Sequence, residues 1–109
     1  MQVFYHLVYE YQKGLRDLSL FTCPDMFQEK IEKSLRQQEI EYIVCPLDGG
    51  KINVFFGRKE CLEIVRRFSC EKLNKLAPEE DFILGMMLGY AKHQQYDRFL
   101  KQKEELCLR

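Results

Sequence analysis

The sequence has no net charge and no long uncharged apolar run. Its 17 lysines and arginines balance 17 aspartates and glutamates, so the basic surface typical of nucleic-acid-binding proteins is not expected. The longest uncharged apolar run, residues 82–91, is about half of the roughly 20 residues that span a bilayer. The N-terminus has no secretion signal pattern. These absences favour a cytoplasmic protein that binds neither nucleic acid nor membrane.

Paired cysteine motifs are also lacking. The five cysteines are an odd number and include no C-x-x-C pair, so neither a disulfide framework nor a zinc site is indicated. No glycine-rich phosphate-binding motif occurs, which leaves nucleotide binding without support. The sequence therefore predicts reduced thiols in a reducing compartment, with no metal and no cofactor.

The composition is that of an ordinary globular protein. Hydrophobic residues make up 46% of the chain and charged residues 31%, which are typical values for folded domains. A chain of this length buries about 60 to 65% of its unfolded surface. We therefore expect residues 1–109 to form a single domain that needs no metal or disulfide to fold.

Residues 40–68 are predicted to form two strands, a tight turn and a helix. Residues 40–45 alternate in the period of two that is typical of a strand with one buried face. Asp48, Gly49 and Gly50 reach positive φ easily, so the chain can reverse there. The second strand places alternate side chains on opposite faces: Ile52, Val54 and Phe56 on one, Asn53 and Phe55 on the other.

The helix that follows Gly57 has a predicted apolar face made by Cys61, Ile64, Val65 and Phe68. Cys61 is expected in the first turns of this helix beside Arg58 and Lys59, an environment that lowers the pKa of a thiol. It also lies on the apolar face, where cysteine usually acts as a small buried hydrophobic residue. Cys61 is therefore either a structural thiol or a reactive one.

The N-terminal half is predicted to supply a helix, a strand and another helix. The apolar residues in 1–13 fit both the periodicity of a helix and the alternation of a strand. Gly14 favours the helix, because a glycine commonly follows the last turn of a helix. Residues 16–22 are typical of a strand with Leu18 and Leu20 inward and Ser19 outward. The next helix is expected to begin with Pro24 at its first position.

The C-terminal half is predicted to be helical. Residues 69–77 form a connector with a helical turn, and Pro78 begins a helix whose acidic first turn suits the helix dipole. Residues 82–90 include no charged residue, so this helix should be buried on all sides. Gly85 and Gly89 share a face and allow another backbone to come close. A sparser apolar stripe continues through a charged final helix.

This order of elements predicts an α+β fold. Its sheet has three strands of split β-α-β, ferredoxin-like type, with an N-terminal helix and additional C-terminal helices. Because helix replaces the last strand of that type, one sheet edge lacks its usual partner. The open edge and the glycine-faced helix together predict a homodimer. The candidate interface residues are Phe55, Phe82, Gly85, Met86 and Gly89, although Phe55 is core if a helix covers its face.

Three segments resemble one known family: KGLRDLSLFT (13–22), INVFFGRKECLEIV (52–65) and EEDFILGMMLGY (79–90). The family is a small bacterial group of uncharacterised proteins catalogued as domain of unknown function 2023, and the resemblance covers nearly the whole chain. It implies three strands, about five helices, a homodimer and no assigned catalytic residue. It also points to a small redox protein, such as a flavodoxin, as a partner.

Two hypotheses about function follow. The first is a non-enzymatic homodimeric interaction module that serves a redox partner. The second is a small-ligand-binding or thiol-dependent enzyme with Cys61 as the reactive group. The acidic residues 79–81 are more typical of a helix start than of acid or base catalysis. His93 and Asp97, one helical turn apart, have no nucleophile placed beside them in the sequence.

Overall fold

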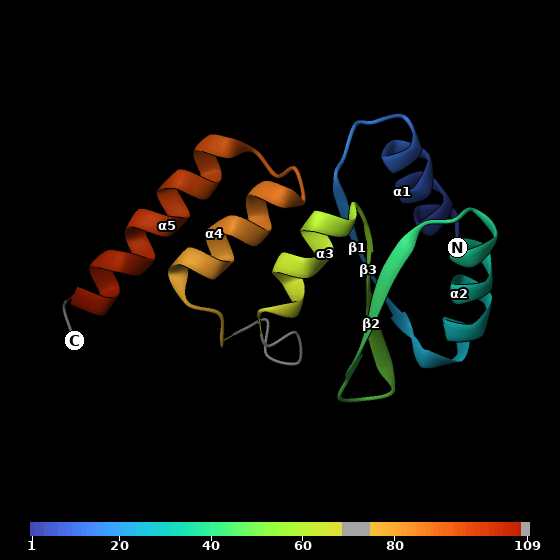
Figure 1. The fold of residues 1–109 in the computed structure, drawn as a ribbon. Coiled ribbons are helices and arrows are strands. Elements are labelled where there is room, and N and C mark those ends of the chain that lie inside the picture. The colour runs from blue at the N-terminus through green and yellow to red at the C-terminus, as the bar shows by residue number, and fades with distance from the viewer. Residues whose placement is uncertain (69–74, 108–109) are drawn as a thin grey trace.

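The computed structural model describes residues 1–68 and 75–107 (Figure 1). Its elements are, in chain order, α1 (Gln2–Gln12), β1 (Leu18–Pro24), the 3-10 helix η1 (Asp25–Phe27), α2 (Gln28–Gln37), β2 (Glu41–Leu47), β3 (Lys51–Gly57), α3 (Lys59–Arg66), α4 (Pro78–Met87) and α5 (Lys92–Cys107). The fold is α+β, as the sequence predicts. Most of the predicted connector over residues 69–77 lies outside the described residues.

Strand β3 is the centre of a three-stranded antiparallel sheet with the order β1-β3-β2. Each residue from Lys51 to Gly57 has a neighbour in both flanking strands. The turn between β2 and β3 contains Gly49 and Gly50, whose φ values of +77° and +71° are easily reached only by glycine. The predicted hairpin is therefore confirmed.

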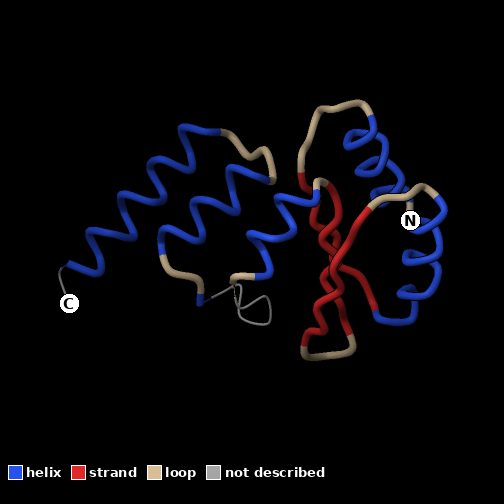
Figure 2. Tube along the Cα trace, in the orientation of Figure 1, coloured by secondary structure: helices blue, strands red, loops and turns tan. Residues whose placement is uncertain are grey.

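Helices cover both faces of the sheet, and Figure 2 shows the twisted strands between two groups of helices. On one face, α1 and α2 pack on Ile52, Val54 and Phe56. On the other face, side chains of α3 and α4 pack on Phe55. The central strand thus supplies both core clusters, and its alternation matches the prediction. Helix α5 lies beyond α4 (Figure 1), and the molecule measures 48 × 32 × 24 Å.

Residues 2–12 form helix α1, which decides the ambiguous N-terminal pattern in favour of helix. Phe4 and Val8 are its buried residues, 0% and 4% exposed. Gly14 follows with a φ of +76°, the left-handed conformation that commonly ends a helix. The glycine after the apolar stripe was therefore the informative signal.

Two predictions around β1 are wrong. Ser19 was expected to face outward, but it is 2% exposed, because the sheet is covered on both faces. Pro24 was expected to begin a helix, but it ends β1. The ladder continues past it, since the Asp25 amide donates to the Gly50 carbonyl at 2.9 Å. A proline is tolerated at an edge-strand position whose nitrogen faces away from the ladder.

Two helical faces also differ from their predictions. The buried residues of α3 are Leu62 and Val65, whereas Ile64 is 36% exposed. Helix α4 was expected to be buried on all sides, but Ile83 is 39% exposed. The sheet and α5 each cover one side of α4, and a third side remains open.

Candidate interaction surfaces

Helices α4 and α5 form a closely packed pair that run in opposite directions (Figure 1). Gly85 makes the close approach possible, because the side chain of Gln95 occupies the space that a Cβ atom would need there. Arg98 donates two hydrogen bonds to the carboxylate of Asp81, at 2.6 and 3.1 Å. Such paired charge-assisted bonds fix geometry well. The pair is thus held together by its own side chains.

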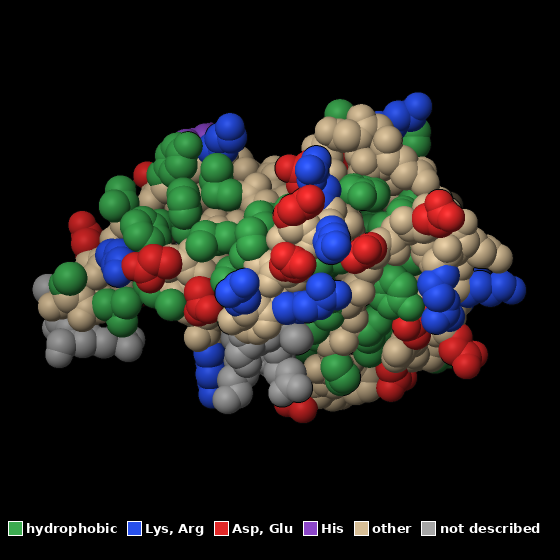
Figure 3. All heavy atoms as spheres, viewed as in Figure 1, with side chains coloured by type: hydrophobic (Ala, Val, Ile, Leu, Met, Phe, Trp, Pro, Cys, Tyr) green, Lys and Arg blue, Asp and Glu red, His purple; other side chains and the backbone are tan. Residues whose placement is uncertain are grey.

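An apolar groove of about 430 Å³ runs along the open side of this pair. We call it the α4–α5 groove, and its lining residues are Glu79, Phe82, Ile83, Tyr96, Phe99 and Leu100. The ring centroids of Phe82 and Phe99, which both line the groove, lie 5.4 Å apart. Tyr96 and Leu100 remain 47% and 60% exposed. Figure 3 shows hydrophobic side chains gathered over α4 and α5.

Helix α5 has little core of its own. Its one buried residue within the described part of the chain is Gln95, and the exposed apolar side chains continue to Leu106, which is 49% exposed. A 16-residue helix is only marginally stable in isolation. Contact of another apolar surface with the open side of α5 would therefore stabilise this helix.

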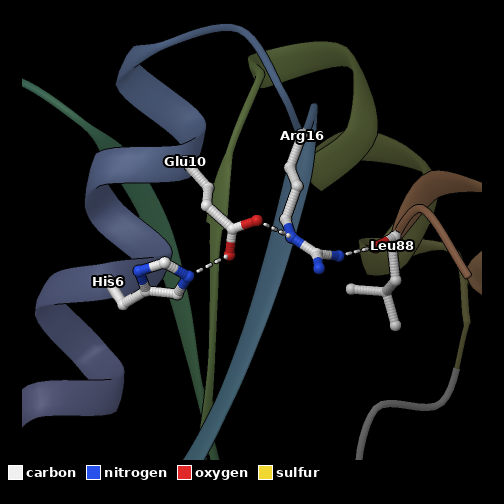
Figure 4. Close-up of polar contacts among 4 residues, drawn as sticks. All are labelled: His6, Glu10, Arg16 and Leu88. Carbon is white, nitrogen blue, oxygen red and sulfur yellow. Dashed lines mark hydrogen bonds and ion pairs between the residues drawn. The ribbon is translucent and has the colours of Figure 1, made fainter.

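Arg16 connects the helices on the two sides of the sheet (Figure 4). Its Nη1 donates to the carbonyl oxygen of Leu88 at 2.5 Å, and its Nε lies 3.3 Å from a carboxylate oxygen of Glu10. The other oxygen of Glu10 lies 3.4 Å from His6 Nε2. The last carbonyls of a helix lack partners within the helix and favour a nearby cation. Arg16 thus caps the end of α4 while it is held from α1.

Cys61 does not lie in the environment that its sequence neighbours suggest. Its side chain is half-buried and packs against the core cluster beneath α3. Burial raises the pKa of the Cys61 thiol and Asp17 raises it further, whereas Arg58 lowers it. The expected lowering of this pKa is therefore reversed, because packing against the core outweighs the arginine.

The five predicted interface residues do not share one surface of the protein. Phe55 is 0% exposed in the core beneath α3 and α4, so the core alternative describes it. Gly85 contacts α5 within the chain, and Gly89, with a φ of +79°, follows the end of α4. Met86 is half-buried, and Phe82 lines the α4–α5 groove. Ile83, Tyr96 and Leu100 were not among the candidates, although the apolar stripe of the final helix was a signal for two of them.

The other acidic candidates have structural roles. Glu80 accepts a hydrogen bond from the backbone amide of Ala77 at 3.0 Å at the start of α4, and Glu79 pairs with Lys103 of α5. Among residues 1–68 and 75–107, no cluster of three or more histidine, cysteine or acidic side chains is suited to hold a metal ion. No helix in that same part of the chain has the length and hydrophobicity needed to cross a membrane.

The fold and these surfaces define a small α+β protein with an apolar groove between its last two helices. The chain belongs to the family of proteins of unknown function DUF2023, whose model matches residues 2–102. The family resemblance of the three sequence segments is thereby confirmed. No similar protein was found among the curated proteins.

Proposed function

We propose that the protein is a non-enzymatic, homodimeric interaction module whose two copies meet at the α4–α5 groove. The observation that carries this proposal is the set of half-exposed apolar side chains around the groove. A contiguous apolar patch on a small protein typically marks a contact surface. Two helices that are packed on one side and apolar on the other are also half of a four-helix bundle.

The rim of the groove favours a second copy as the occupant. In a two-fold dimer each surface meets itself, so a rim of one charge sign would repel its own copy. Here Glu79, which lines the groove, pairs with Lys103 of α5, and the two charges neutralise each other. The protruding Tyr96 and Leu100 of one copy can enter the groove of the other, and the same contact is then made twice.

The size of this face bears on how strongly two copies would bind each other. With ideal helix dimensions, a 16-residue helix is about 24 Å long, and two adjacent helices are about 20 Å wide. The projected area is therefore about 480 Å², well below the roughly 800 Å² of accessible surface that each partner buries in a typical stable complex. Accessible surface exceeds projected area, so a dimer of modest affinity is expected.

The test compares two leucine variants by sedimentation equilibrium. Leu100→Asp places a charge in the groove, whereas Leu15→Asp places one at a similarly exposed leucine in the loop after α1; the two leucines are 60% and 68% exposed. We expect the unmodified protein and Leu15→Asp to be dimers and Leu100→Asp to be a monomer. A monomeric unmodified protein, or a dimeric Leu100→Asp variant, would show that the groove is not the interface.

The partner and compartment are also proposals. We propose a small redox protein such as a flavodoxin as the partner of the dimer, on the strength of the family resemblance. We further propose a cytoplasmic location, supported by the thiols of Cys23, Cys61 and Cys107, which form no disulfide. Reduced thiols persist in reducing compartments.

We also propose that the sheet is of split β-α-β, ferredoxin-like type. The support is its strand order, in which β1 and β2 both run antiparallel to the central β3 and are joined through α2. In a ferredoxin-like unit a fourth strand completes such a sheet. In this chain the segment after α3 leads to helices α4 and α5, which leaves the outer edge of β1 as the place for a further strand.

A further inference from the structure

In strand β1, every second residue points its backbone N–H and C=O groups away from β3, toward the outer edge of the sheet. At one end of the strand the Arg58 amide donates to the Asp17 carbonyl, and at the other the Asp25 amide donates to the Gly50 carbonyl, both at 2.9 Å. These bonds extend the β1–β3 register by one residue at each end. Because ladder bonds use every second residue of an antiparallel strand, the groups that face outward belong to Leu18, Leu20 and Thr22.

These outward groups have no backbone partner among the described residues. Residues 18–23, LSLFTC, also carry no charge. Edge strands are normally protected by charge, by proline or by a covering element. Strand β1 has no charged residue along its whole length, and its only proline is its final residue, Pro24.

The opposite edge, on β2, is protected differently. The same alternation gives the outward positions of β2 to Tyr42, Val44 and Pro46. Pro46 has no N–H group, so it offers no donor at that edge, and the strand begins with the charged Glu41. The two edges of one sheet therefore differ in their capacity to accept another strand.

A trough runs beside the open edge of β1. It consists of two adjoining hollows, of about 130 and 410 Å³, that share Leu20, Leu88 and Tyr90 as lining residues. The smaller hollow lies between Leu7 of α1 and the end of α4. Arg16 bounds it at the Leu18 end of the strand, where its guanidinium reaches Leu88 (Figure 4). An extended chain thus has room beside Leu20, and Thr22, further along the same edge, is exposed.

The buried hydroxyl of Ser19, which lines the smaller hollow, has unused hydrogen-bonding capacity. The hydroxyl of Ser19, which is 2% exposed, has no partner among the described residues. A buried polar group without a partner is costly, which points to a ligand that offers a hydrogen-bonding group beside Ser19.

We propose that the open edge of β1 binds an extended, uncharged peptide segment of another protein, which adds a fourth strand to the sheet. A peptide backbone offers the alternating donors and acceptors that an edge strand requires. The segment is uncharged because both arginines of the trough are already neutralised, Arg16 by Glu10 and Arg98 by Asp81.

A free peptide suits this edge better than a second copy of the chain. The edge is recessed between α1 and the residues that follow α4. The edge of another folded copy carries its own helices on both faces and would meet these walls before its strand could pair. A segment without helical layers has no such obstacle.

The test is a titration of the uniformly ¹⁵N-labelled protein with a blocked octapeptide of alternating valine and threonine, which are uncharged residues that favour strands. The amide resonances of Leu20 and Thr22 should shift and their hydrogen exchange should slow, while Tyr42 and Val44 on the other edge remain unchanged. A twin peptide with N-methyl groups on alternate residues keeps the side chains but loses one row of donors. We expect it to bind about tenfold more weakly or worse, because several backbone bonds are lost.

Two protein variants test the same edge. Thr22→Pro removes one outward donor without touching the ladder to β3, whereas Thr22→Ala removes only the hydroxyl that donates to Asn53. The proline variant should lose peptide binding and the alanine variant should retain it. If Thr22→Pro does not fold, the comparison of the two peptides still shows whether backbone hydrogen bonds hold the peptide at this edge.

Three results would overturn the proposal. The first is the absence of any shift at millimolar peptide, and the second is equal binding of the N-methylated twin. The third is protection of the Leu20 and Thr22 amides without peptide that disappears on dilution, which would assign the edge to a second copy.

Discussion

The two groups of helices bury their apolar side chains to different extents. On one face of the sheet, α1 and α2 place Phe4, Ile31 and Leu35 at 0% exposure. On the other side, Leu84 of α4 and Leu88, which directly follows α4, are buried, but α5 leaves most of its apolar stripe in solvent. The first group therefore buries its main apolar side chains within the chain. The second group is packed on one side only, which is the physical basis for expecting a partner there.

The largest expected effect comes from the complete side. Phe4 is fully buried, and its ring lies 5.6 and 5.7 Å from those of Phe21 and Phe56. Phe4→Ala should lower the free energy of unfolding by about 3 to 5 kcal/mol, since it leaves a cavity in a packed cluster. Urea denaturation measures the loss. Tyr9→Ala, at a 53% exposed position of the same helix, is the control and should cost far less. Equal losses would contradict the contrast between buried and exposed faces.

A smaller effect is expected at the connection between the two groups. Arg16→Met keeps the apolar part of the side chain but removes the hydrogen bond to Leu88 and the pairing with Glu10. We expect a loss of about 1.5 to 3 kcal/mol in the free energy of unfolding, typical of a hydrogen bond made by a charged group. Hydrogen exchange should quicken most at the end of α4. Glu10→Gln leaves the Leu88 bond in place and serves as the matched control; if it destabilises the protein as much as Arg16→Met, the cap on α4 is not the important contact.

The smallest effect concerns the thiols. Because burial raises the pKa of Cys61, a smaller fraction of this thiol is ionised at neutral pH than in the unfolded chain. As pH rises, the unfolded chain ionises first, so the stability from this site is complete at neutral pH and is lost above it. Alkylation near pH 7, followed by mass spectrometry, should label the exposed Cys107 before Cys61. Faster labelling of Cys61 would revive the thiol-enzyme hypothesis.

The sequence predicted the elements better than their surroundings. The hairpin, the two-faced β3 and helix α1 follow from local signals: a double-glycine turn, a period of two and a terminal glycine. The burial of Ser19 does not follow from a local signal. The alternation in β1 assigns its side chains to two faces of the sheet, but it does not show that helices cover both faces. The α4–α5 groove depends on how two helices dock. Gly85 was expected to let another backbone come close, but the group that lies against it is the side chain of Gln95 from α5, a neighbour that the sequence does not identify.

Hydrogen–deuterium exchange at two protein concentrations tests the central claim most directly, because it compares both groups of helices in one sample. If two copies meet at the α4–α5 groove, amides of α5 should exchange faster after dilution, while those of α1 and α2 stay unchanged. Exchange in α5 that is independent of concentration, or a change confined to α1 and α2, would contradict the proposed dimer.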